Sequence, residues 1–326
     1  MSLASPSYVR DLLAQQKIRL KKSLGQHFLV DENILKKIAT AAQLTKEDTV
    51  VEIGAGIGTL TQELAQRAGR VIAVEIDDRL IPLLTEHLRS YSNVVVVHQD
   101  FLQFDLRSAA LLSPGLSPPS PLFPLSLRGE RGLRGEGERG RVRGKKGVSI
   151  VGNLPYHLTT PIIEKLIESR ALLKAATLLI QREVAEKLCT QPGTRDANAI
   201  TIFVQSFAEV QKLLSVSRHV FFPVPDVDSA LVRVEFRERP QFRAPEDLFF
   251  KVVRAAFNLR RKMLKQALTR SPLLALPQEI ALNALEHAQL DPQRRGETLS
   301  IEEFDRLAQA LATVLGLHNC AAPRSR

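Results

Sequence analysis

The sequence lacks tryptophan, has only two cysteines and contains no long apolar run. Cys189 and Cys320 do not have the close spacing of a metal or redox pair, so we expect reduced thiols. No stretch approaches the roughly 18 consecutive apolar residues of a membrane helix, and residues 1–20 lack the apolar core of a signal peptide. None of the seven histidines forms a ligand pair at short spacing. These absences predict a cytoplasmic protein with no membrane contact and no metal ion.

A chain of 326 residues has room for two domains, and its net charge of +10 suggests an anionic partner such as nucleic acid. The charge is unevenly distributed, because residues 107–146 hold nine basic and only three acidic side chains. The remainder of the chain is therefore only about +4. Local clusters of basic residues, and not the overall charge, must identify a nucleic-acid surface.

The most informative stretch is a run of β-branched residues that ends in three alternating glycines, Gly54, Gly56 and Gly58. A helical pattern follows at once. A strand that turns into a helix through glycine brings bare backbone close to a ligand and points the helix N-terminus at it. The next predicted strand, residues 70–75, ends in Glu75, whose carboxylate can accept both hydroxyls of a ribose. These features predict a nucleotide-like ligand at one edge of an α/β sheet.

Two ligand classes fit such a loop. Dinucleotide enzymes typically show G-x-G-x-x-G, which places a helix N-terminus opposite a pyrophosphate. The spacing here is the shorter G-x-G-x-G, from Gly54 to Gly58. It favours a ligand without phosphate, such as S-adenosylmethionine, over a dinucleotide.

Further elements flank this stretch. Asp31 is placed to cap a helix over residues 32–42. The apolar run at 93–100 predicts a parallel strand covered on both faces, and it ends in Asp100. At the ligand-binding edge of the sheet Asp100 is a candidate acceptor for an adenine amino group, with a helix cap as the structural alternative.

Residues 107–146 break the pattern of strands and helices. Five prolines and seven glycines occur among them, with Phe123 as the only aromatic residue. Such a composition cannot bury enough apolar surface to offset the ordering of its backbone. We predict a disordered insertion, with an RNA-contacting arginine–glycine segment as the alternative.

Strand patterns resume at 147–152, 175–181, 210–216 and 229–236, the last two expected to be an antiparallel pair. With the three earlier strands they predict a Rossmann-like α/β sheet of seven strands, mostly parallel. From about residue 240 only helical patterns remain. The predicted domains are therefore 1–239, which holds the ligand site, and 240–326, a smaller all-helical domain.

The helical domain contains a group of basic residues: Arg254, Arg260, Arg261, Lys262 and Lys265. Arg254, Arg261 and Lys265 recur at helical spacing, which predicts a shared helix face. No acid interrupts residues 260–265. The cluster is a candidate contact for RNA phosphates, and a solvated helix face is the alternative.

The second chemical motif is Asn153-Leu154-Pro155-Tyr156, at the end of a predicted strand. Pro155 fixes the backbone so that the Asn153 side-chain carbonyl and the Leu154 backbone carbonyl can point the same way. Two convergent acceptors suit an exocyclic amino group, such as that of adenine. Tyr156 offers a stacking face for the base, and Phe222, held between prolines, is a candidate opposite wall. A structural Asn-Pro turn is the alternative interpretation.

Five ordered motifs resemble the family of small-subunit rRNA adenine dimethyltransferases, the kasugamycin-resistance family. They are GQHFL at 25–29, EIGAGIG at 52–58, NLPY at 153–156, FPVPDVDS at 222–229 and FNLRRK at 257–262. The resemblance implies a class I methyltransferase sheet and transfer of methyl groups from S-adenosylmethionine to the N6 atoms of two adjacent adenosines. These adenosines lie in the loop of the 3′-terminal hairpin of 16S rRNA, within the small ribosomal subunit, and the enzyme is expected to be a monomer with a role in subunit biogenesis.

The resemblance also implies roles for individual residues. The cofactor contacts are His27, Leu29, Gly54, Gly56, Glu75, Asp100 and Asn153, and the residues that handle the base are Asn153, Leu154, Pro155, Tyr156 and Phe222. His27 stands where the family often has asparagine, and the 107–146 insertion is foreign to the family pattern.

Two other functions stay open at this point. A 23S rRNA adenine dimethyltransferase of the macrolide-resistance type shares the catalytic motifs, but residues 257–262 and the helical domain favour the small-subunit class. A non-catalytic ribosome assembly factor with a vestigial cofactor fold is disfavoured by the intact glycine and Asn153–Tyr156 motifs.

Overall fold

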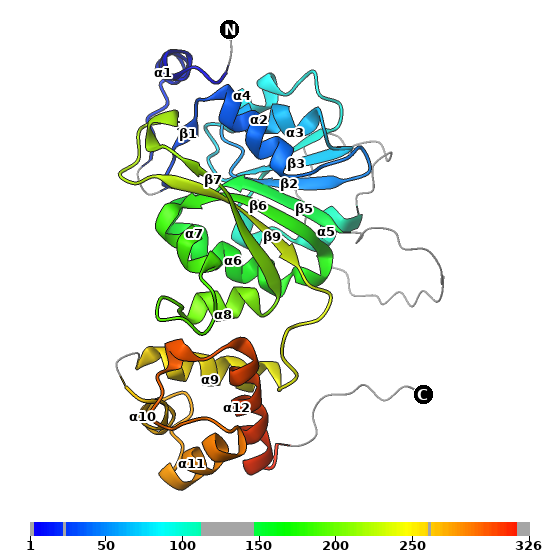
Figure 1. Cartoon of the computed structure of the whole chain (residues 1–326). Helices are drawn as coiled ribbons and strands as arrows, with labels where there is room; N and C mark the ends of the chain where they lie inside the picture. The colour runs from blue at the N-terminus through cyan, green and yellow to red at the C-terminus, as the bar shows by residue number, and fades with distance from the viewer. Residues whose placement is uncertain (1–2, 22–23, 112–146, 260–261, 318–326) are drawn as a thin grey trace, which may run out of the picture. The chain divides into compact units, whose positions relative to one another are not determined.

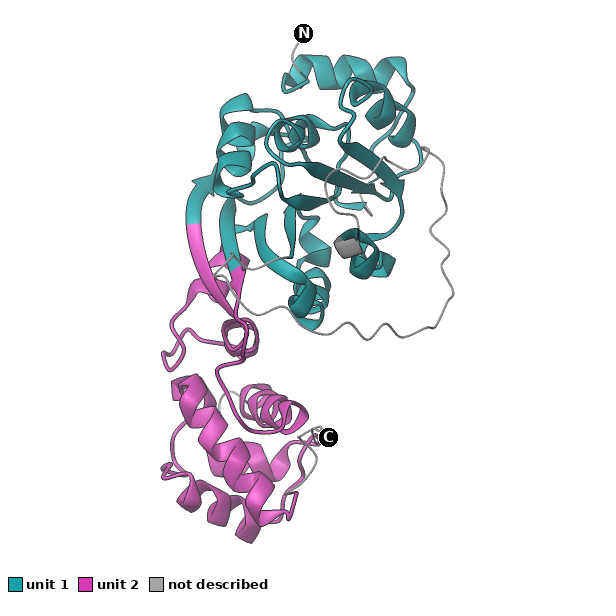
Figure 2. Cartoon of the chain, turned by 90° about the vertical axis from the view of Figure 1, so that its right-hand side faces the viewer, with its two compact units in different colours: residues 1–181, 213–234 teal, residues 182–212, 235–326 magenta. Residues whose placement is uncertain are grey.

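The computed structural model describes residues 3–21, 24–111, 147–259 and 262–317. The chain divides into two compact units, shown in Figure 2. The first comprises residues 1–181 and 213–234, and the second comprises residues 182–212 and 235–326. The predicted domain boundary near residue 240 falls within the second segment of the second unit.

A seven-stranded sheet in the order β4-β3-β2-β5-β6-β9-β7 organises the fold (Figure 1). Its strands are β2 (Thr49–Ile53), β3 (Arg70–Glu75), β4 (Val94–His98), β5 (Val148–Asn153), β6 (Leu173–Gln181), β7 (Ala208–Val216) and β9 (Ser229–Phe236). The pairs β2–β3, β2–β5, β3–β4 and β5–β6 are parallel. The predicted seven-stranded, mostly parallel sheet is confirmed.

Helices of the first unit lie on both sides of this sheet. They are α1 (Pro6–Gln15), α2 (Glu32–Ala41), α3 (Thr59–Ala65), α4 (Ile81–His87), α5 (Leu106–Leu111) and α6 (Thr159–Glu168). Figure 1 shows α2 and α3 on one side and α6 on the other. The Asp31 side chain caps α2 by accepting a hydrogen bond from the Ile34 N–H (3.0 Å), as predicted. Leu35 and Ile38 of α2 pack against Val50 of the sheet, so the apolar stripe of the helix faces the core.

The parallel strand predicted within residues 93–100 is confirmed as β4, but the prediction that it is covered on both faces was wrong. β4 pairs in parallel with β3, but it is the edge strand, and its valines are only half-buried. A run of consecutive valines fits a buried strand and an edge strand equally well, since both favour β-branched side chains.

The predicted insertion at 107–146 also needs correction at its first residues. The helix α5 extends to Leu111, and its residues Leu106 and Ala109 are 3% and 0% exposed. The predicted disorder therefore does not hold for residues 107–111. Residues 112–146, on which the rest of the prediction falls, lie outside the described residues.

A short strand pairing with no signal in the sequence joins two distant segments. β1 (Phe28–Leu29) pairs antiparallel with β8 (Phe221–Phe222), and Phe28 lies opposite Phe222 in the register. Two-residue strands have no periodicity to detect, so only the tertiary structure reveals them. This pairing places the predicted wall residue Phe222 beside the motif at 25–29.

The second unit contains the helices α7 (Arg182–Cys189), α8 (Ala199–Gln205), α9 (Glu246–Asn258), α10 (Leu264–Arg270), α11 (Gln278–His287) and α12 (Ile301–Val314). Phe207, directly after α8, and Phe250 of α9 have ring centroids 5.5 Å apart. Phe242 stacks on Phe249 at 4.1 Å within the same aromatic cluster. Helices α9 to α12 confirm the predicted C-terminal helices. Of the helices that the structure describes, none is long and apolar enough to cross a membrane.

The predicted shared helix face of Arg254, Arg261 and Lys265 was wrong. Arg254 belongs to α9, which ends at Asn258, whereas Lys265 belongs to α10, which begins at Leu264. Arg254 and Lys262 are exposed and Lys265 is half-buried. Arg260 and Arg261 lie outside the described residues.

Candidate active site

A pocket lies at the carboxyl ends of β2, β3 and β5, where the order of the strands reverses direction. Open α/β sheets bind ligands at this point. Nine of the predicted site residues line it together: His27, Leu29, Gly54, Gly56, Glu75, Asn153, Leu154, Pro155 and Tyr156. The cofactor motif and the base-handling motif, almost 100 residues apart in the sequence, therefore share one cavity.

The glycine loop follows β2 and takes a backbone conformation that other residues rarely adopt. Gly54, Gly56 and Gly58 have φ angles of 70°, 60° and 91°. A Cβ on Gly56 would lie 3.1 Å from the Phe28 ring, which also lines the pocket. The loop thus needs glycine both for its conformation and for the closeness of its neighbour.

Glu75, at the end of β3, is 5% exposed and binds this loop. One carboxylate oxygen accepts a hydrogen bond from the Gly56 N–H (2.7 Å), and the other accepts from the N–H groups of Ile76 (2.9 Å) and Asp77 (2.8 Å). Burial raises the pKa of Glu75, while these three N–H groups act in the opposite direction. Because a carboxylate offers about four acceptor positions, Glu75 keeps room for one further strong hydrogen bond from a ligand.

Asn153 ends β5 with its side-chain amide held in one orientation. Its Nδ2 donates a hydrogen bond to the His27 backbone carbonyl at 2.8 Å. A carbonyl can only accept, so the amide nitrogen must face His27 and the amide oxygen must point elsewhere. No described residue donates a hydrogen bond to that oxygen or to the Leu154 backbone carbonyl. The arrangement leaves both predicted acceptors available to a ligand.

Two rings border these acceptors. His27 and Tyr156 stack with centroids 5.8 Å apart and planes 24° apart. The Tyr156 hydroxyl is hydrogen-bonded to the Ser229 hydroxyl (2.9 Å), and His27 Nδ1 to the Pro223 carbonyl (2.7 Å). Both aromatic side chains are therefore fixed from outside the pocket. The group at position 27 that holds Asn153 is the backbone carbonyl. Any residue supplies this carbonyl, so the contact does not depend on whether the side chain is histidine or asparagine.

Two predicted site residues do not line the pocket. The Asp100 carboxylate accepts a hydrogen bond from the Leu102 N–H (2.8 Å) and caps the short 3₁₀ helix Phe101–Gln103. This helix cap is the structural alternative to a contact with an adenine amino group. Phe222 is half-buried and packs in a cluster with Phe28 and Leu80, both of which line the pocket. The proposed contacts of both residues stay predictions.

Glu52, for which the sequence predicted no role, also lines the pocket. Glu52 is 2% exposed, and its Oε2 has no hydrogen-bond partner among the described residues. Burial raises its pKa from 4.5 to about 8, and the nearby Glu75 carboxylate adds to the rise. Its place two residues before Gly54, at the end of a buried strand, was the available signal.

The raised pKa of Glu52 predicts a pH-dependent stability. The folded protein holds this proton more tightly than the unfolded chain, so stability falls as the pH rises from 4.5 to about 8. Glu52→Gln has no proton to lose. Between pH 5.5 and 8.5 we expect the Tm of the wild type to fall by at least about 5 °C more than the Tm of Glu52→Gln. Thermal denaturation across this range measures the difference, with the exposed Glu86→Gln as control. Parallel curves for Glu52→Gln and wild type would contradict the assignment.

Two observations show that the pocket suits S-adenosylmethionine. The unpartnered, buried Glu52 oxygen is placed to accept from a cationic ammonium group, which this cofactor carries. The glycine loop leaves space at Gly54, where a Cβ would meet only the Asn153 backbone carbonyl, 3.9 Å away. In the part of the chain that the structure describes, no cluster of three His, Cys, Asp or Glu side chains is arranged to hold a metal. The strand order, with β9 between β6 and β7, and this pocket define a class I methyltransferase that uses S-adenosylmethionine.

The family model described as ribosomal RNA adenine dimethylase matches residues 17–313, and the chain belongs to this family. The chain is 40% identical over 311 residues to ribosomal RNA small subunit methyltransferase A of Geobacillus thermodenitrificans, covering 95% of this chain and 97% of the relative. It is 37% identical to the protein of the same name from Clostridium botulinum, covering 94% of this chain and 99% of the relative.

Two solved structures share the fold. A dimethyladenosine transferase from Plasmodium falciparum superposes with a TM-score of 0.68 at 27% identity, covering 87% of this chain and 97% of the other. The 23S rRNA methyltransferase ErmE superposes with a TM-score of 0.60 at 27% identity, covering 87% and 99%.

Proposed function

We propose that this chain dimethylates the N6 atoms of two adjacent adenosines in the loop of the 3′-terminal hairpin of 16S rRNA. The substrate is the small ribosomal subunit during its biogenesis in the cytoplasm, and the chain acts as a monomer. Bound S-adenosylmethionine supplies the electrophilic methyl group on its sulfonium. The remaining chemistry belongs to residues of the chain.

Asn153 and Leu154 orient the target amine. The adenine amino nitrogen is a poor nucleophile because its lone pair is delocalised into the ring. The Asn153 side-chain oxygen and the Leu154 backbone carbonyl each accept one N6–H, which draws the hydrogens away from the ring plane. The nitrogen lone pair then becomes available to attack the methyl carbon, in line with the carbon–sulfur bond that breaks. Such alignment can contribute roughly 7–11 kcal/mol.

Pro155 and Tyr156 complete the base site. Pro155 restricts the backbone between the two acceptors, and Tyr156, fixed through Ser229, offers its ring face to the adenine. An adenine buried in a duplex cannot reach the pocket, so the base must be extruded or lie in a loop. Alkylation makes the remaining amine proton acidic, and water can take it without a dedicated general base.

The observation that carries the proposal is the orientation of the Asn153 amide, with its free oxygen in the same pocket as Gly54 and Glu75. The test is methyl transfer by purified protein to small subunits from cells that lack this modification. Mass spectrometry of the 16S rRNA is expected to show two dimethylated adenosines in the hairpin loop. Methylation of large-subunit rRNA instead would favour the 23S alternative, and no methylation of either would favour an assembly factor.

RNA contacts outside the pocket are assigned to the exposed Arg254 and Lys262 and to Lys265. Arg260 and Arg261 share this predicted role on sequence grounds alone. Side chains of this kind neutralise phosphates and supply sequence-independent affinity.

Phe222 is proposed to stack on the target base. Loss of a stacking partner costs about 1–3 kcal/mol per base, so Phe222→Ala should lower kcat/KM for the subunit by about 10- to 100-fold. The Kd for S-adenosylhomocysteine, measured by calorimetry, should not change, because Phe222 does not line the cofactor pocket. Phe222→Tyr keeps a ring and should keep activity. A Phe222→Ala enzyme with wild-type kcat/KM would remove the stacking role.

A further inference from the structure

The segment just before the GQHFL motif alternates in its exposure. Ile18 and Leu20 are half-buried and pack against a core cluster that includes Phe28 and Leu80, which line the pocket. Between and beside them, the basic side chains of Lys17, Arg19 and Lys21 are exposed. From Ile18 to Lys21 this alternation is that of an extended chain with one face on the core, whereas Lys17, with a φ of 53°, lies in the turn that ends α1. The segment sets three positive charges in a row on the outer face, beside the pocket wall.

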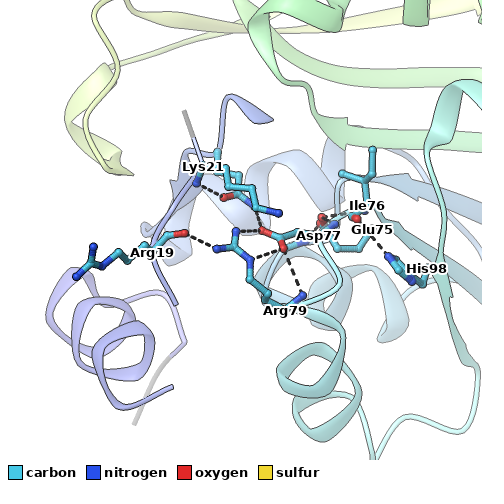
Figure 3. Close-up of polar contacts among 9 residues, drawn as sticks. Arg19, Lys21, Glu75, Ile76, Asp77, Arg79 and His98 are labelled. Carbon is cyan, nitrogen blue, oxygen red and sulfur yellow. Dashed lines mark hydrogen bonds and ion pairs between the residues drawn. The ribbon is translucent and has the colours of Figure 1, made fainter. Parts of the chain in front are cut away.

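This segment is anchored through its backbone. Arg79 Nη1 donates to the Arg19 backbone carbonyl (2.6 Å), and the Lys21 backbone N–H donates to the Gln26 side chain (3.2 Å). Both anchors converge on Asp77, which is 1% exposed, pairs with Arg79 and accepts from Gln26 Nε2 at 2.8 Å (Figure 3). The Asp77 backbone N–H in turn binds Glu75 (2.8 Å).

These anchoring hydrogen bonds involve the backbone of residues 19 and 21 and not their basic side chains. The Arg19 side chain points away from the Asp77 network in Figure 3. None of Lys17, Arg19 and Lys21 forms an ion pair with an acid that the structure describes. The backbone is thus held in place while its cations remain available to a partner, which is the arrangement of a preorganised binding surface.

A fourth cation comes from α1. Val9 and Leu13 of this helix are buried in the same core cluster as Phe28, and they fix the helix against the pocket wall. On the exposed side, the Arg10 guanidinium lies 5.6 Å from the centroid of the Phe222 ring. This distance is typical of a cation–π contact. It places a positive charge directly beside the ring proposed to stack on the target base.

We infer that Arg10, Lys17, Arg19 and Lys21 form a binding surface for the RNA phosphates that flank the extruded adenosine. The inference rests on the proposed function and extends it to the path of the strand on either side of the base. Alternate residues of an extended segment, such as Arg19 and Lys21, are about 6.6 Å apart, so neighbouring cations can meet separate phosphates of one strand. An anionic strand is the partner that an unpaired row of like charges favours.

The test neutralises the row in the full chain with the triple variant Lys17→Gln, Arg19→Gln, Lys21→Gln. Binding to the 3′-terminal hairpin RNA is measured by fluorescence anisotropy at several salt concentrations. Loss of three phosphate contacts should lower the slope of log Kd against log salt by about two. With whole subunits KM should rise about tenfold at moderate salt while kcat stays unchanged. The Kd for S-adenosylhomocysteine should also stay at the wild-type value.

A matched triple variant on the same unit, Lys36→Gln, Lys37→Gln, Arg89→Gln, removes the same charge from α2 and from the turn after α4. It should leave the slope and KM unchanged. An Arg10→Gln variant should weaken RNA binding on its own, because it removes the cation beside Phe222. An unchanged salt slope in the first triple variant, or an equal effect in the matched one, would overturn the inference. Loss of subunit binding without loss of hairpin binding would point to a ribosomal protein as the partner and would also overturn it.

These outcomes are distinct from failure of the proposed function. Anisotropy reports RNA binding whether or not methyl transfer occurs. A wild-type protein that binds the hairpin but transfers no methyl group would contradict the proposed activity and leave the binding surface supported.

Discussion

Replacing Asn153 by alanine is expected to lower kcat for methyl transfer to small subunits by about 10²- to 10³-fold, the cost of removing one preorganised polar group at a reacting centre. The structure gives the reason. The amide nitrogen is fixed on the His27 carbonyl, which leaves the oxygen available to the amine that we propose binds there. Alanine removes that acceptor and leaves Leu154 as the only one.

Single-turnover assays with radiolabelled S-adenosylmethionine measure this effect. Asn153→Asp is a sharper variant, because it keeps an oxygen but places a second one against the His27 carbonyl, where a donor is required. It should also lose activity. Asn93→Ala is the matched control, since Asn93 donates to the Ala65 and Ala68 carbonyls in a purely structural role. That variant should lose stability but keep kcat. An Asn153→Ala enzyme within tenfold of wild type would exclude the acceptor role.

Replacing Glu75 by alanine is expected to weaken S-adenosylhomocysteine binding by at least about 100-fold. Its carboxylate accepts from three backbone N–H groups, one of them in the glycine loop. Removing the carboxylate leaves those buried N–H groups unsatisfied, which costs about 1–3 kcal/mol for each group. It also releases Gly56 from its position. The ligand loses both a contact and the shape of the loop.

Isothermal titration calorimetry measures the binding loss, and thermal denaturation shows whether the fold survives. Glu75→Gln keeps a carbonyl acceptor but turns an NH₂ group towards backbone donors, so an intermediate affinity is expected. The neighbouring Asp78 is exposed, and Asp78→Asn should bind as the wild type does. Near wild-type affinity of Glu75→Ala would show that the carboxylate serves the fold alone.

Much of this protein was readable from short stretches of sequence. The strand Arg70–Glu75 has the predicted bounds, and Asp31 caps α2 as expected. The three glycines of the loop all have positive φ. Each of these features depends on residues close to one another in the chain, so local pattern is sufficient to predict it. The ordered motifs likewise predicted the family.

Other features depend on contacts between distant residues. β4 proved to be an edge strand, and the pairing of Phe28 with Phe222 joins segments nearly 200 residues apart. The supposed helix face of Arg254 and Lys265 is divided between two helices. Spacing alone cannot show such a break, because a basic run has no periodic apolar signal to mark where a helix ends.

The sequence by itself determined the α/β class, the glycine turn, the Asn153–Tyr156 corner and the membership of a methyltransferase family. Only the tertiary structure decided which way the Asn153 amide faces, that three backbone N–H groups hold Glu75, and that Asp77 anchors the backbone at Arg19 and Lys21 through Arg79 and Gln26. The physical reason is that periodicity and turn chemistry are local. Hydrogen-bond partners and charge environment, in contrast, are set by groups that meet only when the chain has folded.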